Sequence, residues 1–176
     1  MSHYRRNYLA GGTFFFTVKL ANSKSCLLVE QIDLLREAYA FVQQRYAFET
    51  VAVCVLPNHI HAVWALPDGD DDYSLRWRLL KTKFSDAVES LENISASKKR
   101  RREKGIWQRR FYEHTVCDDA DLRRCVDYVY FNPVKHGLVN SVKEWPFSSF
   151  HRDVRRGLFA LDWGGSKESS VMNLGE

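Results

Sequence analysis

Cysteine is scarce in this chain, and the four that occur, Cys26, Cys54, Cys117 and Cys125, show no CxxC spacing. Closely spaced cysteine pairs are typical of thiolate zinc sites, and regular cysteine frameworks are typical of disulfide-bonded secreted domains. The pattern argues against both and predicts reduced thiols in the cytosol. Long apolar runs are lacking as well. Residues 1–10 are polar and basic, so neither a signal peptide nor a membrane span is predicted.

Acidic residues are sparse in the middle of the chain, where basic residues are crowded. The whole chain has 26 Lys and Arg against 22 Asp and Glu, a net charge of +4. The basic residues in question are Arg76, Arg78, Lys81, Lys83, Lys98, Lys99, Arg100, Arg101, Arg102, Lys104, Arg109 and Arg110. A clustered positive field attracts phosphate backbones. A solvated loop next to a charged helix face would give the same pattern, and the sequence leaves both interpretations open.

The length and periodicity of the chain predict one domain with an ordered core. It has 176 residues, 45% of them hydrophobic, and no internal repeat. Strands are predicted from alternating or β-branched runs, and helices from apolar residues three and four apart. The predicted strands are residues 11–20, 48–56, 59–66 and 107–116, and the predicted helices are residues 31–46, 74–91 (capped by Ser74) and 118–131 (capped by Asp118 or Asp119).

The order of these elements predicts the fold class. Strand, helix, strand, strand, helix, strand, helix is the order of an α+β, ferredoxin-like split βαβ sandwich. Such a fold has an antiparallel sheet of four to five strands with helices on one or both faces. Residues 1–140 would form this domain, and residues 141–176 a C-terminal extension that packs on the core through aromatic residues and ends in disorder. The fold hosts many functions, so function has to be inferred from a site.

Two histidines at alternate positions open the third predicted strand. Residues two apart on a strand point to the same face, so His59 and His61 project together, while Ile60, Ala62 and Trp64 face the helices. Neutral imidazole binds divalent metals, and two imidazoles leave coordination positions open for a phosphate oxygen and water. Two polar residues on a half-exposed strand would account for the same letters.

A tyrosine and an asparagine lie one turn apart on the last predicted helix. Tyr128 and Asn132 are separated by about 40° around the helix axis, while Tyr130 points elsewhere. Because Pro133 disfavours helical geometry at the residue before it, we expect the helix to end or bend at Asn132. The alternatives are a half-buried tyrosine that packs on the sheet and a plain helix-end asparagine.

Metal-assisted attack by a tyrosine is one chemistry that these residues could perform. About 0.1% of a free tyrosine is phenolate at neutral pH, so its attack on a phosphate needs assistance. A metal bound to the phosphate would neutralise the developing charge. The product, a phosphotyrosine, keeps the bond energy and can pass the phosphate to a new strand. No general base can be named, and His114 is a candidate by residue type alone.

Five stretches of the chain resemble a known family. They are YRRNYLAGGTFFFTV at 4–18, LPNHIHAVWALP at 56–67, WQRRFYEH at 107–114, VDYVYFNPVKHGLV at 126–139 and WPFSSFHRDVRRG at 145–157. In combination they resemble the REP-associated tyrosine transposases, relatives of the single-tyrosine transposases within the HUH superfamily of single-strand nucleases. The resemblance covers most of residues 4–163.

The resemblance implies a site and a reaction. His59 and His61 match the HUH motif, Tyr128 the nucleophile, and Asn132 the third metal ligand, with Mg²⁺ or Mn²⁺ as the cofactor. The reaction implied is cleavage and rejoining of single-stranded DNA at REP hairpins through a 5′-phosphotyrosine, with a free 3′-OH. The implied location is the cytoplasm, in association with the nucleoid. The chain would act as a monomer or as a homodimer that exchanges tyrosine helices, and its tail would partly cover the DNA site.

DNA contacts are expected from two further sets of residues. The N-terminal stretch matches the segment that reads the foot of the hairpin, where arginine can bind a guanine edge and tyrosine can stack on an unpaired base. The candidates for base contacts are Tyr4, Arg5, Arg6 and Asn7. The other candidates for DNA contacts are Arg76, Lys81, Lys83, Gln108, Arg109, Arg110 and His114.

Two alternative functions remain open from the sequence. A non-catalytic module that binds single-stranded or hairpin DNA would use the same sheet, basic loops and aromatic residues. A metal-dependent hydrolase would use water as the nucleophile and Tyr128 as a structural residue. The binding module predicts that metal changes only the affinity, and the hydrolase predicts no covalent adduct.

Overall fold

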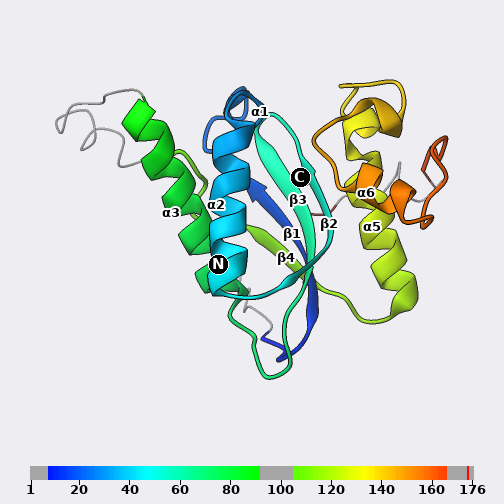
Figure 1. Ribbon diagram of the computed structural model, residues 1–176, viewed down its shortest axis with the longest axis horizontal. Helices are drawn as coiled ribbons and strands as arrows, with labels where there is room; N and C mark the ends of the chain where they lie inside the picture. Colours follow the sequence, from blue (N-terminus) through cyan, green and yellow to red (C-terminus); the bar gives the residue numbers. More distant parts are fainter. Residues whose placement is uncertain (1–7, 92–104, 166–173, 175–176) are drawn as a thin grey trace, which may run out of the picture.

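The computed structural model describes residues 8–91, 105–165 and 174 of the chain. A sheet lies between two helical layers (Figure 1). The elements are β1 (Thr13–Lys19), α1 (Leu27–Glu30), α2 (Ile32–Arg45), β2 (Glu49–Val55), β3 (His59–Ala65), α3 (Tyr73–Leu91), β4 (Tyr112–Thr115), α5 (Asp119–Lys135), the 3₁₀ helix η1 (Val142–Glu144) and α6 (Phe150–Arg155). No helix among these described residues is both long and apolar enough to cross a membrane.

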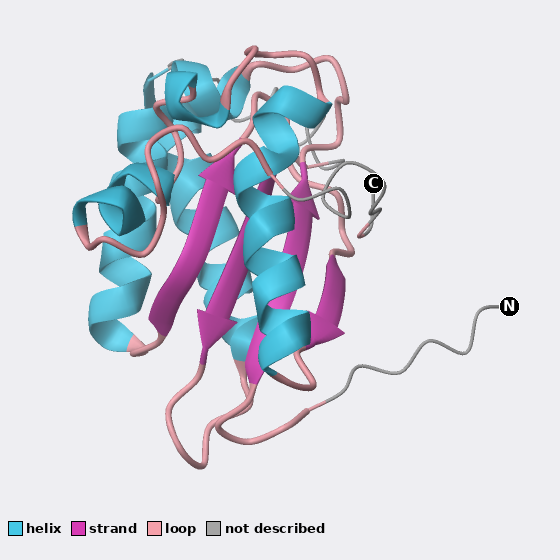
Figure 2. Ribbon diagram, turned by 90° about the vertical axis from the view of Figure 1, so that its right-hand side faces the viewer, coloured by secondary structure: helices cyan, strands magenta, loops and turns pink. Residues whose placement is uncertain are grey.

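The four-stranded sheet has the order β2-β3-β1-β4, and every neighbouring pair is antiparallel (Figure 2). This is the predicted ferredoxin-like arrangement, and it is confirmed. The fourth strand is shorter than the predicted 107–116. Trp107 makes only an isolated bridge to Leu20, because the residues between it and Tyr112 leave the ladder and pack toward α3, where Lys81 Nζ donates to the carbonyl of Gln108 at 3.0 Å.

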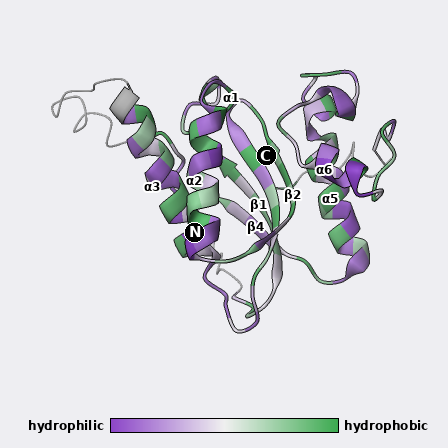
Figure 3. Cartoon of the chain, viewed as in Figure 1, coloured by the Kyte–Doolittle hydropathy of each residue, from purple (hydrophilic) through white to green (hydrophobic). Residues whose placement is uncertain are grey.

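Helices α2 and α3 cover one face of the sheet. The aromatic residues of this layer pack closely, and the indole rings of Trp64 and Trp77 stack with centroids 4.2 Å apart. Ile60 and Ala62 belong to the same buried cluster. The even-numbered residues of β3 therefore face α2 and α3, as their alternation predicted. In Figure 3 the two helices carry both hydrophobic and hydrophilic residues, in line with one buried and one exposed side each.

Helix α5 and the C-terminal segment cover the opposite face (Figure 1). Phe15 and Val63 from the sheet join Val126 and Val129 of α5 in a second buried cluster, which also includes Phe150 of α6. Because β-strand side chains alternate, the odd-numbered residues of β3 face this layer. His59 and His61 are among them.

The C-terminal extension packs on the core, as predicted. Residues 147–149 run antiparallel to β2: Val55 N–H donates to the Phe147 carbonyl at 2.8 Å, and Ser149 N–H donates to the Val53 carbonyl at 2.8 Å. The guanidinium of Arg152 donates to backbone carbonyls of residues 50 and 51 at 2.8 and 2.6 Å. Most of the terminal stretch predicted to be disordered, residues 166–173 and 175–176, lies outside the described residues.

Both helix N-termini near the site are capped by aspartate. Asp118 accepts a hydrogen bond from the N–H of Asp121 at 2.8 Å, as predicted for α5. The prediction that Ser74 caps α3 is wrong. Asp72 accepts from the N–H of Leu75 at 2.8 Å, so the cap lies two residues earlier and the helix begins at Tyr73.

Helix α5 does not end at Asn132, which corrects the prediction. It continues through Pro133 to Lys135. The proline lacks one N–H, but the next turn closes normally, since His136 N–H donates to the Asn132 carbonyl and Leu138 N–H to the Pro133 carbonyl, both at 2.9 Å. Gly137, with φ of 65°, provides the left-handed residue that ends the helix. The favourable helix terminus offsets the local preference of the residue before proline.

Candidate active site and basic groove

Strand β3 and helix α5 bring the two sequence motifs together. The imidazole rings of His59 and His61 have centroids 4.7 Å apart, and the ring of Tyr128 lies 5.2 Å from that of His61. His61 and Tyr128 are completely buried, and His59 is 7% exposed. The histidine pair and the tyrosine, distant in the sequence, therefore form one cluster between the sheet and α5.

A threonine on the neighbouring strand determines the tautomer of His61. Thr17 Oγ1 lies 2.9 Å from His61 Nδ1. The hydroxyl donates its own proton to the carbonyl of Leu174 at 2.6 Å, so Oγ1 accepts the proton of Nδ1. The lone pair of His61 is then on Nε2, the nitrogen available to a metal.

An asparagine does the same for His59. Asn58 Nδ2 donates to the carbonyl of Ser23, which orients Oδ1 of the same amide as an acceptor. This Oδ1 lies 2.6 Å from His59 Nδ1. The proton of His59 is therefore on Nδ1, and its buried Nε2 carries the lone pair. Both histidines have the tautomer that a pair of metal ligands requires.

Asn132 supplies an oxygen of the kind that hard divalent cations prefer. Its side chain is completely buried, and its Nδ2 donates weakly, at 3.4 Å, to the carbonyl of Tyr128. Within the described part of the chain, Asn132 Oδ1 has no hydrogen-bond partner. A buried, unsatisfied carbonyl oxygen costs about 1–3 kcal/mol, a cost that a bound cation would remove. Two imidazole nitrogens and one amide oxygen fit Mg²⁺ or Mn²⁺.

The hydroxyl of Tyr128 is held from two directions. Lys135 Nζ and the backbone N–H of Leu174 both donate to it at 3.4 Å. Phe15 packs edge-on against the ring, with centroids 5.7 Å apart. Tyr130 points away, as predicted, and donates to Asp153 Oδ2 at 2.5 Å. Of these two tyrosines, only Tyr128 faces the histidines.

Several residues of this site escaped the sequence analysis. Lys135 and His136 follow Asn132 on the same helix end, and the exposed His136 ring lies 5.1 Å from the ring of His59. The expectation that the helix ended at Asn132 concealed both. Thr17 and Asn58 act through hydrogen bonds across strands or turns, for which the sequence carries no signal.

His114 is held at the beginning of α5. Its Nε2 is 2.8 Å from Asp121 Oδ2, and the thiol of Cys125 lies within 4.8 Å of both groups. Burial alone would raise the pKa of Asp121, but hydrogen bonds from the Cys117 backbone, His114 and Arg124 outweigh it and hold the pKa below its usual value. Burial raises the pKa of the Cys125 thiol to about 12. The structure therefore ties His114 to Asp121, two turns before Tyr128.

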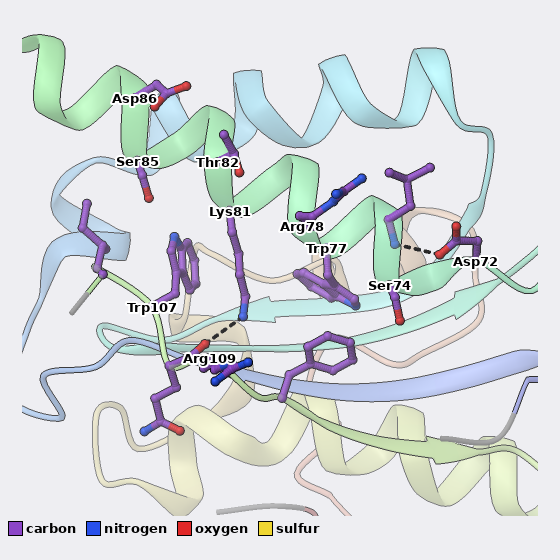
Figure 4. A pocket seen from close by; sticks show the side chains of 15 residues that line it. Asp72, Ser74, Trp77, Arg78, Lys81, Thr82, Ser85, Asp86, Trp107 and Arg109 are labelled. Atoms are coloured by element: carbon purple, nitrogen blue, oxygen red, sulfur yellow. Dashed lines mark hydrogen bonds between the residues drawn. The ribbon is translucent and has the colours of Figure 1, made fainter. Parts of the chain in front are cut away.

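A groove of about 680 Å³ collects some of the predicted phosphate-binding residues (Figure 4). Its walls are α3 and residues 105–111, and Lys81, Gln108 and Arg109 line it. Lys81 Nζ lies 5.8 Å from the ring centroid of Trp107 and 5.5 Å from that of Phe111. A cationic groove with aromatic walls is suited to a nucleic-acid strand.

Arg76 does not belong to this groove, which corrects its assignment as a phosphate ligand. It is 2% exposed, and its guanidinium donates to Asp70 Oδ2 at 2.6 Å and to the Ala47 carbonyl at 2.7 Å. These bonds leave it inaccessible to a phosphate. Lys83 lies elsewhere on α3, above the ring of Phe41 at 4.5 Å.

The remaining predicted contacts divide between the surface and the part of the chain that is not described. Arg110 is exposed next to the groove. Tyr4, Arg5, Arg6 and Asn7 lie outside the described residues, as does the basic stretch 98–104, so the predictions for them remain predictions.

The chain is similar to proteins of known family over nearly its whole length. The REP-associated tyrosine transposase of Escherichia coli K12 is 50% identical over 165 residues, which cover 94% of this chain and 92% of the relative. The chain belongs to the REP-associated tyrosine transposases. A Haemophilus influenzae protein, assigned provisionally to the same family by its name, is 45% identical over 97% of this chain and 98% of its own. No protein-family model matches the chain.

A solved structure of this family matches the fold closely. It is a REP-associated tyrosine transposase bound to a REP hairpin, with a TM-score of 0.88, 48% identity, and coverage of 100% of this chain and 98% of the other. This family member thus shares the architecture of an enzyme whose structure contains its hairpin. The named relatives are tyrosine transposases, so the family is one of enzymes.

In this transposase the groove and the tyrosine lie in different layers. Trp77 and Phe111 in the groove belong to the α2 and α3 layer, while Tyr128 belongs to the α5 layer. Strand β4, which follows Phe111 directly, forms the edge of the sheet between them. A strand that contacts both would pass around the β4 edge.

Proposed function

We propose that this chain is a metal-dependent, single-stranded DNA transesterase that binds, cleaves and rejoins REP-type hairpin DNA through a 5′-phosphotyrosine. The observation that carries the proposal is the contact between Tyr128 and His61, 5.2 Å between ring centroids. It places a nucleophile of the right type against a ligand pair that has the right tautomers. Family membership and the hairpin-bound relative support the choice of substrate.

The residues of this chain have distinct roles in the proposed reaction. His59, His61 and Asn132 would hold Mg²⁺ or Mn²⁺, which would supply charge neutralisation at the scissile phosphate. Tyr128 Oη forms a bond to phosphorus as the bond from phosphorus to the 3′ oxygen breaks. Burial of Tyr128 and His61 excludes competing water, which favours a covalent intermediate over hydrolysis.

The proposed site is complete within one chain. Tyr128 and His61 come from the same molecule and are in contact, so no tyrosine helix has to be borrowed from a second copy. We propose a monomer as the active unit. Mixing Tyr128→Phe protein with His61→Ala protein then leaves cleavage absent, whereas restored activity would show exchange of α5 between subunits.

The decisive experiment uses a labelled single-stranded hairpin oligonucleotide from the genome that encodes the protein. Incubation with Mn²⁺ is expected to give a protein-linked band on a denaturing gel, and EDTA is expected to remove it. Tyr128→Phe abolishes the band and leaves the native-gel shift, while Tyr46→Phe, which alters an exposed tyrosine elsewhere, retains both. A native-gel shift with no covalent band in the wild type would favour the binding module, and cleavage without an adduct would favour the hydrolase.

A further inference from the structure

The ammonium group of Lys135 lies directly at the hydroxyl of Tyr128. Its Nζ donates to Tyr128 Oη at 3.4 Å and lies 4.8 Å from the centroid of the phenol ring. Lys135 is seven residues after Tyr128, which corresponds to about 700° of helix rotation, about 20° short of two full turns. The two side chains therefore lie on the same stripe of α5, and Lys135 points back toward the phenol.

The end of α5 makes this alignment possible. The helix passes Pro133, and Gly137 terminates it with φ of 65°. If the helix ended at Asn132, Lys135 would follow an irregular path and leave the stripe of Tyr128. The extra turn keeps the amine partly buried beside the phenol, where its charge is screened less than on an open surface.

We propose that Lys135 is a catalytic residue that stabilises the phenolate of Tyr128, an inference that rests on Tyr128 being the nucleophile. A positive charge within hydrogen-bond reach favours the anionic form of a phenol, and the neutral phenol nucleophile is weak. The role needs the ammonium form, so Lys135 acts as a donor and a charge and does not take up the proton.

The proton and bond balance of the step is complete without a further reactant. The phenol proton leaves to solvent water, and the phenolate oxygen then forms its bond to phosphorus. The 3′ oxygen departs with the electron pair of the broken bond and takes a proton from water. In the rejoining step the phenolate is the leaving group, so Lys135 stabilises the same species in both directions. Its loss slows cleavage and rejoining by the same factor and leaves their ratio unchanged.

Other groups also face Tyr128 and have to be separated from Lys135 in any test. Strand β3 places the imidazole of His61 there, β1 the uncharged ring of Phe15, and the C-terminal segment the N–H of Leu174. Among these, Lys135 carries the full positive charge at neutral pH. A change that removes this charge and keeps the length of the side chain therefore isolates its contribution.

The test compares Lys135→Met, Lys135→Arg and the control Lys143→Met, in which an exposed lysine of η1 is altered. The rate of covalent adduct formation with Mn²⁺ is measured from about pH 6 to about pH 10, where a free phenol ionises. Lys135→Met is expected to lose roughly tenfold to hundredfold at neutral pH, a deficit that shrinks as pH rises. Lys135→Arg retains most of the rate, and the control all of it.

A second measurement does not need metal or DNA. The ultraviolet difference between wild type and Tyr128→Phe, titrated with alkali, reports ionisation of Tyr128 alone, and the same difference is taken with Lys135→Met in both proteins. We expect the transition to move to higher pH without the lysine. An unmoved transition, or a deficit equal at every pH, overturns the inference. If Lys135→Met does not fold, Lys135→Gln replaces it. Cleavage that survives Tyr128→Phe would instead refute the proposed function itself.

Discussion

Thr17 and His61 face each other across neighbouring strands, with Thr17 Oγ1 2.9 Å from His61 Nδ1. The hydroxyl fixes both the tautomer and the orientation of the ring, and the antiparallel pairing of β1 with β3 positions it. The metal ligand is therefore prepared by the sheet before any metal arrives. A pre-oriented ligand loses less conformational entropy on binding.

Replacing this hydroxyl tests its role directly. Thr17→Val keeps the shape of the side chain and removes the acceptor, so His61 is no longer held in one tautomer. We expect the affinity for Mn²⁺ to fall roughly tenfold to hundredfold, measured by electron paramagnetic resonance on the free protein. Thr17→Ser restores the hydroxyl and is expected to bind nearly as well as wild type. Equal affinity in Thr17→Val and wild type would contradict the role.

Tyr128 and Tyr130 form a natural pair of matched variants. Tyr130→Phe removes the hydrogen bond to Asp153 Oδ2 and leaves a buried carboxylate with one partner fewer, so we expect a loss of about 1–3 kcal/mol in the free energy of unfolding. Adduct formation persists in that variant under native conditions. Tyr128→Phe is expected to behave in the opposite way, with stability near wild type and no adduct. Urea unfolding and the denaturing gel measure the two effects, and a loss of adduct in both variants would remove the distinction.

Arg76 and Lys81 are expected to differ although both are basic residues of α3. Arg76→Met breaks a buried ion pair and should cost about 3 kcal/mol of stability, at the lower end for such pairs because Asp70 is 35% exposed. Lys81→Met should leave stability nearly unchanged and weaken hairpin binding. The slope of log affinity against log salt should fall by roughly 0.9, as for one lost phosphate contact. An unchanged slope would exclude Lys81 from the DNA interface.

Asp121 gives the protein an acid-sensitive contact between β4 and α5. Its pKa is lowered in the folded state, so the stabilisation that it provides is present above the pKa of the unfolded chain, about 3.9. That stabilisation is lost as pH falls through the lower, folded-state pKa. Asp121→Asn removes this dependence, so the difference in melting temperature between wild type and variant should shrink on acidification. A difference that stays constant with pH would contradict the assignment.

The C-terminal end of the chain is expected to restrain the tyrosine. Leu174 donates its N–H to Tyr128 Oη and accepts a hydrogen bond from Thr17, positions close to where a substrate phosphate has to bind. A chain that stops after Gly165 should therefore form the adduct faster at equal hairpin concentration. Quantitative gel kinetics measure this. If neither binding nor cleavage changes, the extreme tail has no part in the site.

The parts of the fold and site that depend on local periodicity were predictable from the sequence. The alternation around His59 and His61 gave the face on which both lie, and the spacing of Tyr128 from Tyr130 gave the tyrosine that faces them. Each of these depends only on the geometry of one element. The order of the elements was sufficient for the topology of the sheet.

The parts that depend on packing between distant segments were not predictable. Arg76 looked like a surface cation because a charged residue on a helix is usually exposed, but Asp70 and two backbone carbonyls form a buried site for it. Pro133 looked like a helix end because its local preference is strong, yet Gly137 supplies a better one. Lys135 was overlooked as a consequence.

The segment 147–149 covers the β2 edge of the sheet with backbone from the same chain. An uncovered edge strand exposes a row of unpaired amides and carbonyls that can add a strand from another molecule. Here those of Val53 and Val55 are already bonded, so a second copy could extend the sheet on this side only by displacing the segment. Association through β2 is thus blocked by the fold itself, which keeps neighbouring copies from fusing their sheets during synthesis and crowding.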